Sequence, residues 1–180
     1  MSTLTELNGT YTIDPSHSRI GFVTRHAMVT KVRGNFGEFE GTINVAENIA
    51  DSTAEATIKA ASISTGNEDR DGHVKNEDFF NVEEYPELSF TTTNVNVDED
   101  GNGTVTGDLT IKGTTKSVDL DVEDVATAED PFGNTRLGFE ATTKINRKDF
   151  GIDFNAPLKT GGVLVSEEIK IELEVSAIKK

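Results

Sequence analysis

The chain has 180 residues, enough for one domain with a sizeable core. Its 32 Asp and Glu against 17 Lys and Arg give a net charge of −15, which argues against nucleic acid or an anionic lipid surface as a partner. Cysteine is absent, which excludes disulfides, thiolate chemistry and cysteine metal sites. No stretch approaches the roughly 18 consecutive apolar residues of a membrane span. The N-terminus lacks the basic and apolar regions of a secretory signal, so we expect a cytoplasmic location.

Most of the chain alternates apolar and polar residues with a period of two, the pattern of a strand with one wet face. We expect residues 1–9 to be disordered or extended and residues 10–180 to form a single domain. Turn-forming residues separate the alternating runs, as at residues 98–103. About eight strands are predicted, at residues 18–25, 37–45, 53–63, 87–97, 105–111, 117–125, 137–145 and 165–175.

One segment, residues 67–82, breaks this period. Asn67 is a good helix N-cap residue and the next residues are acidic, so a short, irregular helical excursion is predicted. Phe79 and Phe80 need apolar surroundings, and the open end of a barrel is the nearest place. They are expected either to cover a pocket as a lid or to complete the core as a plug.

A sheet of about eight strands must close or split, because free edges and an exposed apolar face are costly. The prediction is an all-β fold, an antiparallel β-barrel of about eight strands. The interior of such a barrel either fills with side chains or holds one small ligand. Small residues at predicted inward positions favour a cavity, whereas the ten dispersed Phe residues are more typical of a plain core than of a ligand site. These small residues are Gly21, Ala54, Ala56, Gly107 and Ala141.

One acidic run fits the positions of a calcium-binding loop, but we reject that interpretation. Its first position is a neutral amide and its twelfth is Asp, shorter than the usual Glu, while the preceding residues look like a strand. A helix N-cap followed by solvated acids explains the run better. The residues concerned are Asn67, Asp69, Asp71, Gly72 and Asp78.

The three histidines offer the main alternative site. His17, His26 and His73 could converge with Asp14 and Asp71 as a metal site or as an enzyme's acid and base. Their spacings match no local metal motif, and the chain has no Gly-x-Ser-x-Gly elbow. We therefore predict no catalytic residue, no metal and no cofactor, and keep this cluster as an alternative.

Four blocks, in order within residues 10–178, resemble the YceI-like polyisoprenoid-binding family. The resemblance implies an extended lipocalin-like barrel, an isoprenoid such as a polyprenyl phosphate or quinone tail in its interior, and a tendency to form homodimers. Many members are periplasmic with a cleaved leader, and this chain is expected to be a cytoplasmic one. The blocks are YTIDPSHSRIGF, RHAMV and VRGNF (11–36), STGNEDRDGHV and DFFNVEEYP (64–86), GDLTIKGTTK (107–116) and INRKDFG (145–151).

The predicted function is that of a binding or carrier protein for a long apolar isoprenoid, and not that of an enzyme. Two alternatives stay open: an enzyme using the histidine and carboxylate cluster, and a stress protein with a packed barrel and no ligand. The candidate head-group contacts are Arg25, His26 and Arg147. The candidate wall residues are Ile20, Phe22, Val32, Phe36, Phe79, Phe80, Phe90, Leu109, Ile111, Phe139, Ile145, Phe150 and Phe154.

Overall fold

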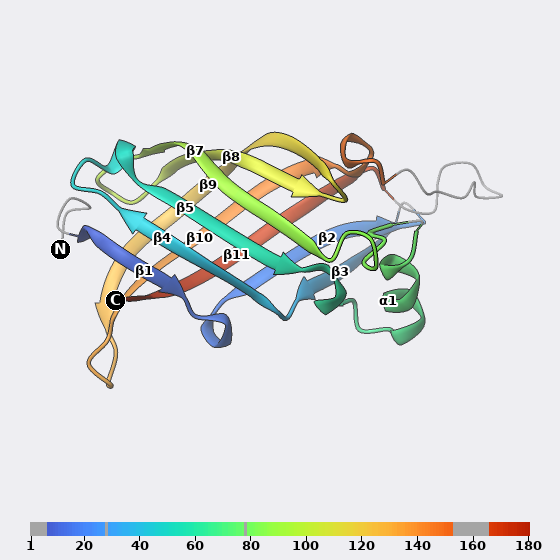
Figure 1. The fold of residues 1–180 in the computed structure, drawn as a ribbon, viewed down its shortest axis with the longest axis horizontal. Helices are drawn as coiled ribbons and strands as arrows, with labels where there is room; N and C mark the ends of the chain where they lie inside the picture. Colours follow the sequence, from blue (N-terminus) through green and yellow to red (C-terminus); the bar gives the residue numbers. More distant parts are fainter. Residues whose placement is uncertain (1–6, 28, 78, 153–165) are drawn as a thin grey trace.

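The computed structural model describes residues 7–27, 29–77, 79–152 and 166–180, and most of them lie in β-strands (Figure 1). Within these residues there is one α-helix, α1 (Glu68–Lys75), and short 3-10 helices η2 (Pro15–His17), η3 (Ile49–Asp51), η4 (Ala60–Ser62) and η5 (Arg147–Phe150). The strands are β1 (Gly9–Ile13), β2 (Arg19–His26), β3 (Thr30–Phe36), β4 (Phe39–Val45), β5 (Thr53–Lys59), β6 (Ile63–Ser64), β7 (Glu87–Val97), β8 (Gly103–Ile111), β9 (Thr114–Glu129), β10 (Thr135–Asn146) and β11 (Glu168–Lys179).

Eight of the strands form a closed antiparallel ring in the order β1, β4, β5, β7, β8, β9, β10 and β11. The ring closes where β1 pairs with β11, with Tyr11 opposite Lys179 and Ile13 opposite Ala177. Closure removes the free edges that an open sheet of this size would present. The predicted all-β, eight-stranded antiparallel barrel is therefore confirmed.

The remaining strands, β2, β3 and β6, lengthen the barrel at the end that carries α1 (Figure 1). β2 and β1 pair with successive parts of β11, so β1 and β2 lie end to end along the same neighbour, with η2 between them. β3 and β4 share a path in the same way, as do β5 and β6 on either side of η4. The predicted strands do not include β1 or β3, and the single strand predicted at 53–63 is broken by η4.

α1 lies in the segment that connects β6 to β7, which have no pairing with each other in the described residues. The Asn67 side chain accepts a hydrogen bond from the Arg70 amide (3.0 Å), so Asn67 is the N-cap that the sequence predicts. Asp71 fixes the helix to the barrel by accepting hydrogen bonds from the Thr65 amide and hydroxyl (2.7 and 2.5 Å). None of the helices in the described part of the chain has the length and apolarity that a bilayer crossing requires.

Two inward-facing glycines make room for aromatic rings from neighbouring strands. A Cβ atom at Gly34 would lie 2.4 Å from Cζ of Phe22, and one at Gly107 would lie 2.4 Å from Cζ of Phe90. Gly21 also lines the cavity, but only with its backbone, because a side chain there would meet the Arg19 guanidinium. Its neighbours in β2 point inward, and side chains alternate along a strand.

The two chain termini lie at the end of the barrel opposite α1 (Figure 1), where a cluster of buried side chains includes Tyr11, Ile43 and Ala177. Tyr11 is fully buried, and its hydroxyl donates to the Leu7 carbonyl (2.8 Å). Burial raises the pKa of the Tyr11 hydroxyl above its ordinary value. Leu7, which lies in the segment expected to be disordered or extended, is part of this buried cluster.

An ion-pair network on the outer surface joins parts of the chain that are far apart in sequence. Arg136 donates from Nη1 to Oδ2 of Asp14 (2.9 Å) and from Nε to Oδ2 of Asp130 (2.7 Å). The Arg136 guanidinium holds the pKa of Asp130 down at about 2. Hydrogen bonds from Ser16 and then from Arg136 hold the pKa of Asp14 far below its usual range. The network fixes the end of β1 to the start of β10.

Replacing Arg136 by Gln should make the protein less sensitive to acid while lowering its stability near neutral pH. A carboxylate with a depressed pKa stabilises the native state fully above its unfolded pKa of about 3.9, and this contribution disappears as the pH falls through the folded pKa. The difference in free energy of unfolding between the natural protein and Arg136→Gln should therefore shrink between about pH 5 and pH 2. Urea unfolding over this pH range measures it.

Lys59→Gln is the control for that experiment, because Lys59 forms an exposed ion pair with Glu38 (3.4 Å). Exposed pairs contribute little, so this variant should follow the natural protein at every pH. Parallel pH profiles for Arg136→Gln and the natural protein would show that the network does not control acid stability.

Gly107→Ala should lower the free energy of unfolding by about 1–3 kcal/mol, the usual range for overpacking a core. The added Cβ would meet the Phe90 ring and also the Thr91 carbonyl oxygen at 2.7 Å, which belongs to the backbone and cannot rotate away. Gly138→Ala is the matched control, since the nearest atom to its Cβ is 3.6 Å away. Equal denaturation midpoints for the two variants would contradict this packing account.

Candidate functional site: an apolar cavity inside the barrel

The barrel encloses a cavity of about 450 Å³. This volume is within the usual range of small-molecule sites, about 300–1,000 Å³. Every strand of the closed ring contributes lining residues, as do β2, β3, β6 and α1. A barrel whose interior is filled by its own side chains would have no such space, so the structure favours a binding cavity over the packed alternative.

The buried apolar side chains form three separate clusters and leave space between them. One cluster surrounds Phe36 and Phe79 at the α1 end, and another surrounds Tyr11 at the opposite end. The third consists of Leu120, Val122 and Ala141 on β9 and β10. Two alanines of β5 that the sequence placed inward, Ala54 and Ala56, line the cavity itself.

Aromatic rings line the α1 end of the cavity. Phe36 contacts both Phe22 and Phe80, each with 5.9 Å between ring centroids, and Phe79 meets His73 edge to face at 5.1 Å. Phe79 and Phe80 also line the cavity. These two residues therefore pack against the core and form part of the cavity wall.

Three arginines line the α1 end of the cavity, although the chain as a whole is strongly acidic. Arg147 is only 4% exposed and donates from Nε to the Ser166 carbonyl (2.9 Å) and from Nη1 to the Ile152 carbonyl (2.7 Å). Arg25 and Arg70 are exposed to solvent while also lining the cavity. This end thus combines access to solvent with positive charge.

Most of the ligand contacts predicted from the sequence line the cavity. Phe150 does not: it is buried in the cluster at the α1 end, because it lies in η5, where the strand period of two no longer applies. The His26 side chain and the whole of Phe154 lie outside the described residues. The lining residues among those predicted are Ile20, Phe22, Arg25, Val32, Phe36, Phe79, Phe80, Phe90, Leu109, Ile111, Phe139, Ile145 and Arg147.

Sequence reasoning missed several lining residues that strand parity could have found. Val118, Leu120, Ile171 and Leu173 continue the alternation of strands that the sequence did predict. Arg70 gave no such signal, since its place beside the cavity depends on how α1 packs.

Of the histidine and carboxylate residues considered as an enzyme site, those that the structure describes do not gather. Asp14 and His17 lie together, with 2.8 Å between Oδ2 and Nδ1, but the His17 side chain is 65% exposed and on the outer surface. Asp71 binds Thr65 beside α1, and His73 lines the cavity. No three of these residues come within metal-binding distance of one another in the described part of the chain.

Glu68–Lys75 of the run that fits a calcium loop form a helix. A calcium-binding loop would need these same residues in a loop conformation. Asp78 of that run lies outside the described residues. The structure thus agrees with a capped helix at this position.

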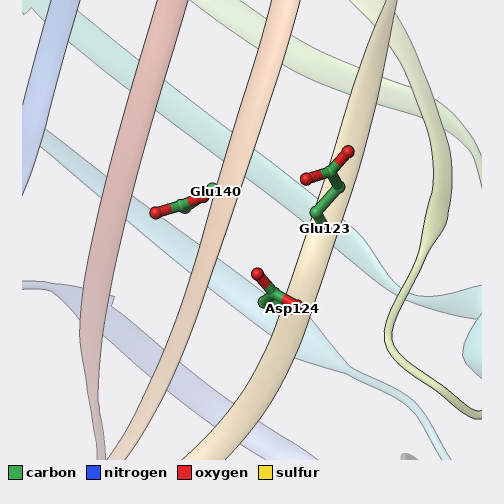
Figure 2. A group of neighbouring side chains, drawn as sticks. All are labelled: Glu123, Asp124 and Glu140. Atoms are coloured by element: carbon green, nitrogen blue, oxygen red, sulfur yellow. The ribbon is translucent and has the colours of Figure 1, made fainter.

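A different acidic group lies on the outside of the barrel, where Glu123, Asp124 and Glu140 place carboxylate oxygens within 4.8 Å of one another (Figure 2). Glu123 and Glu140 are directly opposite each other on β9 and β10. Asp124 has a φ of 59° at the register shift between these strands. All three side chains are exposed, and exposed acids are common on so acidic a chain, so we assign no metal to them.

Comparisons with known proteins place this barrel among relatives. A family model described as the YceI-like domain matches residues 11–177. A Staphylococcus aureus relative described as a UPF0312 protein is 40% identical over 167 residues, which cover 90% of this chain and 93% of that protein.

Solved structures share the fold. The Campylobacter jejuni YCEI protein has a TM-score of 0.74 and 32% identity, covering 87% of this chain and 90% of that one. Burkholderia cenocepacia BcnA has a TM-score of 0.78 at 24% identity, covering 91% and 98%. A domain from Saccharophagus degradans, described as polyisoprenoid binding, has a TM-score of 0.69 at 17% identity, covering 94% and 98%. Because the YceI-like family model matches residues 11–177 of this chain and the Staphylococcus aureus relative is 40% identical to it, this chain belongs to the YceI-like family.

Proposed function

We propose that this protein binds and carries one long apolar lipid of the isoprenoid class inside its barrel. The observation that carries the proposal is the cavity of about 450 Å³, lined by apolar side chains of every ring strand. Such a wall offers a hydrocarbon chain few hydrogen bonds, and binding comes from removing apolar surface from water, at about 25 cal/mol per Å².

The choice of an isoprenoid is supported by the family. A solved structure with the same fold, from Saccharophagus degradans, is described as a polyisoprenoid binding domain. Two ligand types fit the polar end of the cavity: a polyprenyl phosphate, whose charge the arginines would neutralise, and a quinone, whose oxygens would accept hydrogen bonds from them.

The two alternative functions receive less support. A packed barrel without a ligand does not agree with the cavity. An enzyme based on the histidine and carboxylate residues would need them to converge, and the described ones lie in separate places. Binding without catalysis is therefore the function that we propose; the cytoplasmic location and the homodimer stay predictions.

Native mass spectrometry of the freshly purified protein should show a bound hydrophobic mass. After removal of the lipid, the protein should take up an isoprenoid quinone or a polyprenyl phosphate added from detergent, one molecule per chain. A clean mass of the free protein, together with no uptake of either probe, would sink the proposal.

A side chain that fills the cavity should block the ligand without harming the fold. Ala56 lines the cavity, so Ala56→Leu places extra apolar volume in the space that the lipid would occupy. Overlap of this kind costs about 1–3 kcal/mol, so the affinity for the isoprenoid quinone should fall roughly ten-fold or more. The thermal midpoint of the ligand-free protein should not decrease.

Ala126→Leu is the matched control, because Ala126 is exposed and does not line the cavity. It adds the same atoms to the outer surface and should bind the quinone as the natural protein does. If Ala56→Leu and Ala126→Leu bound the quinone equally well, the ligand would have to lie elsewhere.

A further inference from the structure

The charge of this chain is unevenly distributed along its length. Residues 15–37 contain four of the 17 Lys and Arg and none of the 32 Asp and Glu. Among the described residues of this segment are η2, β2 and β3. In so acidic a chain, an acid-free segment of this length with four cations is a local reversal of charge that the net value conceals.

The structure places three of these cations on one face of the β2–β3 hairpin. Arg25 is directly opposite Lys31, and Arg33 is opposite Val23, which lies on the same face as Arg25. All three charged side chains are exposed, and none forms an ion pair with a described residue. Like charges directly opposite each other on paired strands are destabilising, so folding alone does not account for this arrangement.

The turn of the same hairpin exposes an apolar side chain. Val29 is 76% exposed. In the described part of the chain only one other large apolar side chain is exposed, Phe132 at 85%. Phe132 lies in the turn between β9 and β10, at the end of the barrel that holds the chain termini (Figure 1).

The hairpin also lies at the α1 end of the lipid cavity. Thr24, Arg25 and Val32, all from its two strands, line that cavity. The exposed Val29 thus lies between the exposed cations Arg25 and Lys31, and Arg25 also lines the cavity. We use the name basic hairpin for Arg25, Val29, Lys31 and Arg33 on β2, β3 and their turn.

We propose that the basic hairpin docks the α1 end of the barrel on an anionic phospholipid bilayer. The three cations would lie against the lipid phosphates, and Val29 would enter the interfacial layer. The proposal rests on the proposed function, because a protein that carries a membrane lipid must exchange it with a bilayer.

Neighbouring charges agree with an approach that begins at the hairpin. On β11, which pairs with β2, Glu168 and Glu172 each have a lysine within 4.0 Å, Lys144 and Lys170 respectively. Glu68, Asp69 and Asp71 in the first turn of α1 would be repelled by anionic lipid, so the hairpin and not α1 would have to lie against the bilayer. Charges more than about 8 Å from the lipid surface are largely screened at physiological salt.

Flotation of the natural protein with vesicles tests the proposal directly. It should bind vesicles of phosphatidylcholine containing about a third of phosphatidylglycerol, and the binding should weaken as salt is added. A Lys or Arg near such a surface is worth about 1 kcal/mol, so Lys31→Gln with Arg33→Gln should weaken binding roughly 25-fold. Lys179→Gln with Lys180→Gln removes the same charge at the opposite end and should have little effect.

A tryptophan probe gives a second readout, because the natural chain contains no Trp. Trp fluorescence of Val29→Trp should shift to the blue when anionic vesicles are added. Phe132→Trp, at the opposite end, should not shift. Equal shifts for both variants would contradict docking through the hairpin.

The two proposals fail in different ways. Lys31 and Arg33 do not line the cavity, so their double variant should still take up isoprenoid quinone from detergent. Uptake from detergent without binding to anionic vesicles would overturn docking and leave lipid binding intact. Equal binding to neutral and anionic vesicles, or unchanged vesicle binding by the double variant, would also overturn docking. Binding of the hairpin to a protein partner and not to vesicles would overturn it as well.

Discussion

The pairing of the two chain ends is the constraint on which the rest of the structure depends. β1 and β11 share three residue pairs, and the central and last of these bring Ile178 and Ala177 against Thr12 and Ile13. Without them, the sheet would have two free edges and an apolar face open to water. Joining residues this distant in sequence requires most of the chain to be ordered first. The cavity exists only because this ring is complete.

Interruptions of the strands give the cavity its accessible end. η2 and η4 divide long paths into β1 and β2, and into β5 and β6, so the extended part of the barrel does not close between β6 and β7. The described residues of the segment between β6 and β7, 65–77 and 79–86, lie at this opening and include α1, Phe79 and Phe80. Sheet hydrogen bonds are lost there, and a polar segment with exposed arginine takes their place. A continuous ring would have left no comparable end at which the proposed ligand could enter.

The sequence predicted regular strands well because burial on one face imposes a period of two. The predicted strand at 87–97 is observed with the same bounds. β1 and β3 escaped detection because one is short and the other combines Lys31, Arg33 and Gly34 with few apolar residues. Facing failed at Phe150, where a 3-10 helix replaces the strand. The volume of a cavity is the space inside the ring minus the volume of the inward side chains. No local sequence pattern gives this difference.

In the proposed function, the chemical difference between the two ends of the cavity would give the ligand a direction. Leu7 and Ile43 of the Tyr11 cluster line the end near the chain termini together with Ser52, Thr53 and Glu55, whereas Arg25, Arg70 and Arg147 line the α1 end. An anionic head group placed near the Glu55 carboxylate would be repelled, whereas the arginines at the α1 end would attract it. In the proposed function the tail would therefore enter first and the head group would stay near the arginines. The basic hairpin lies at that same end, so a bilayer held there would face the head group, and the lipid could return without turning around.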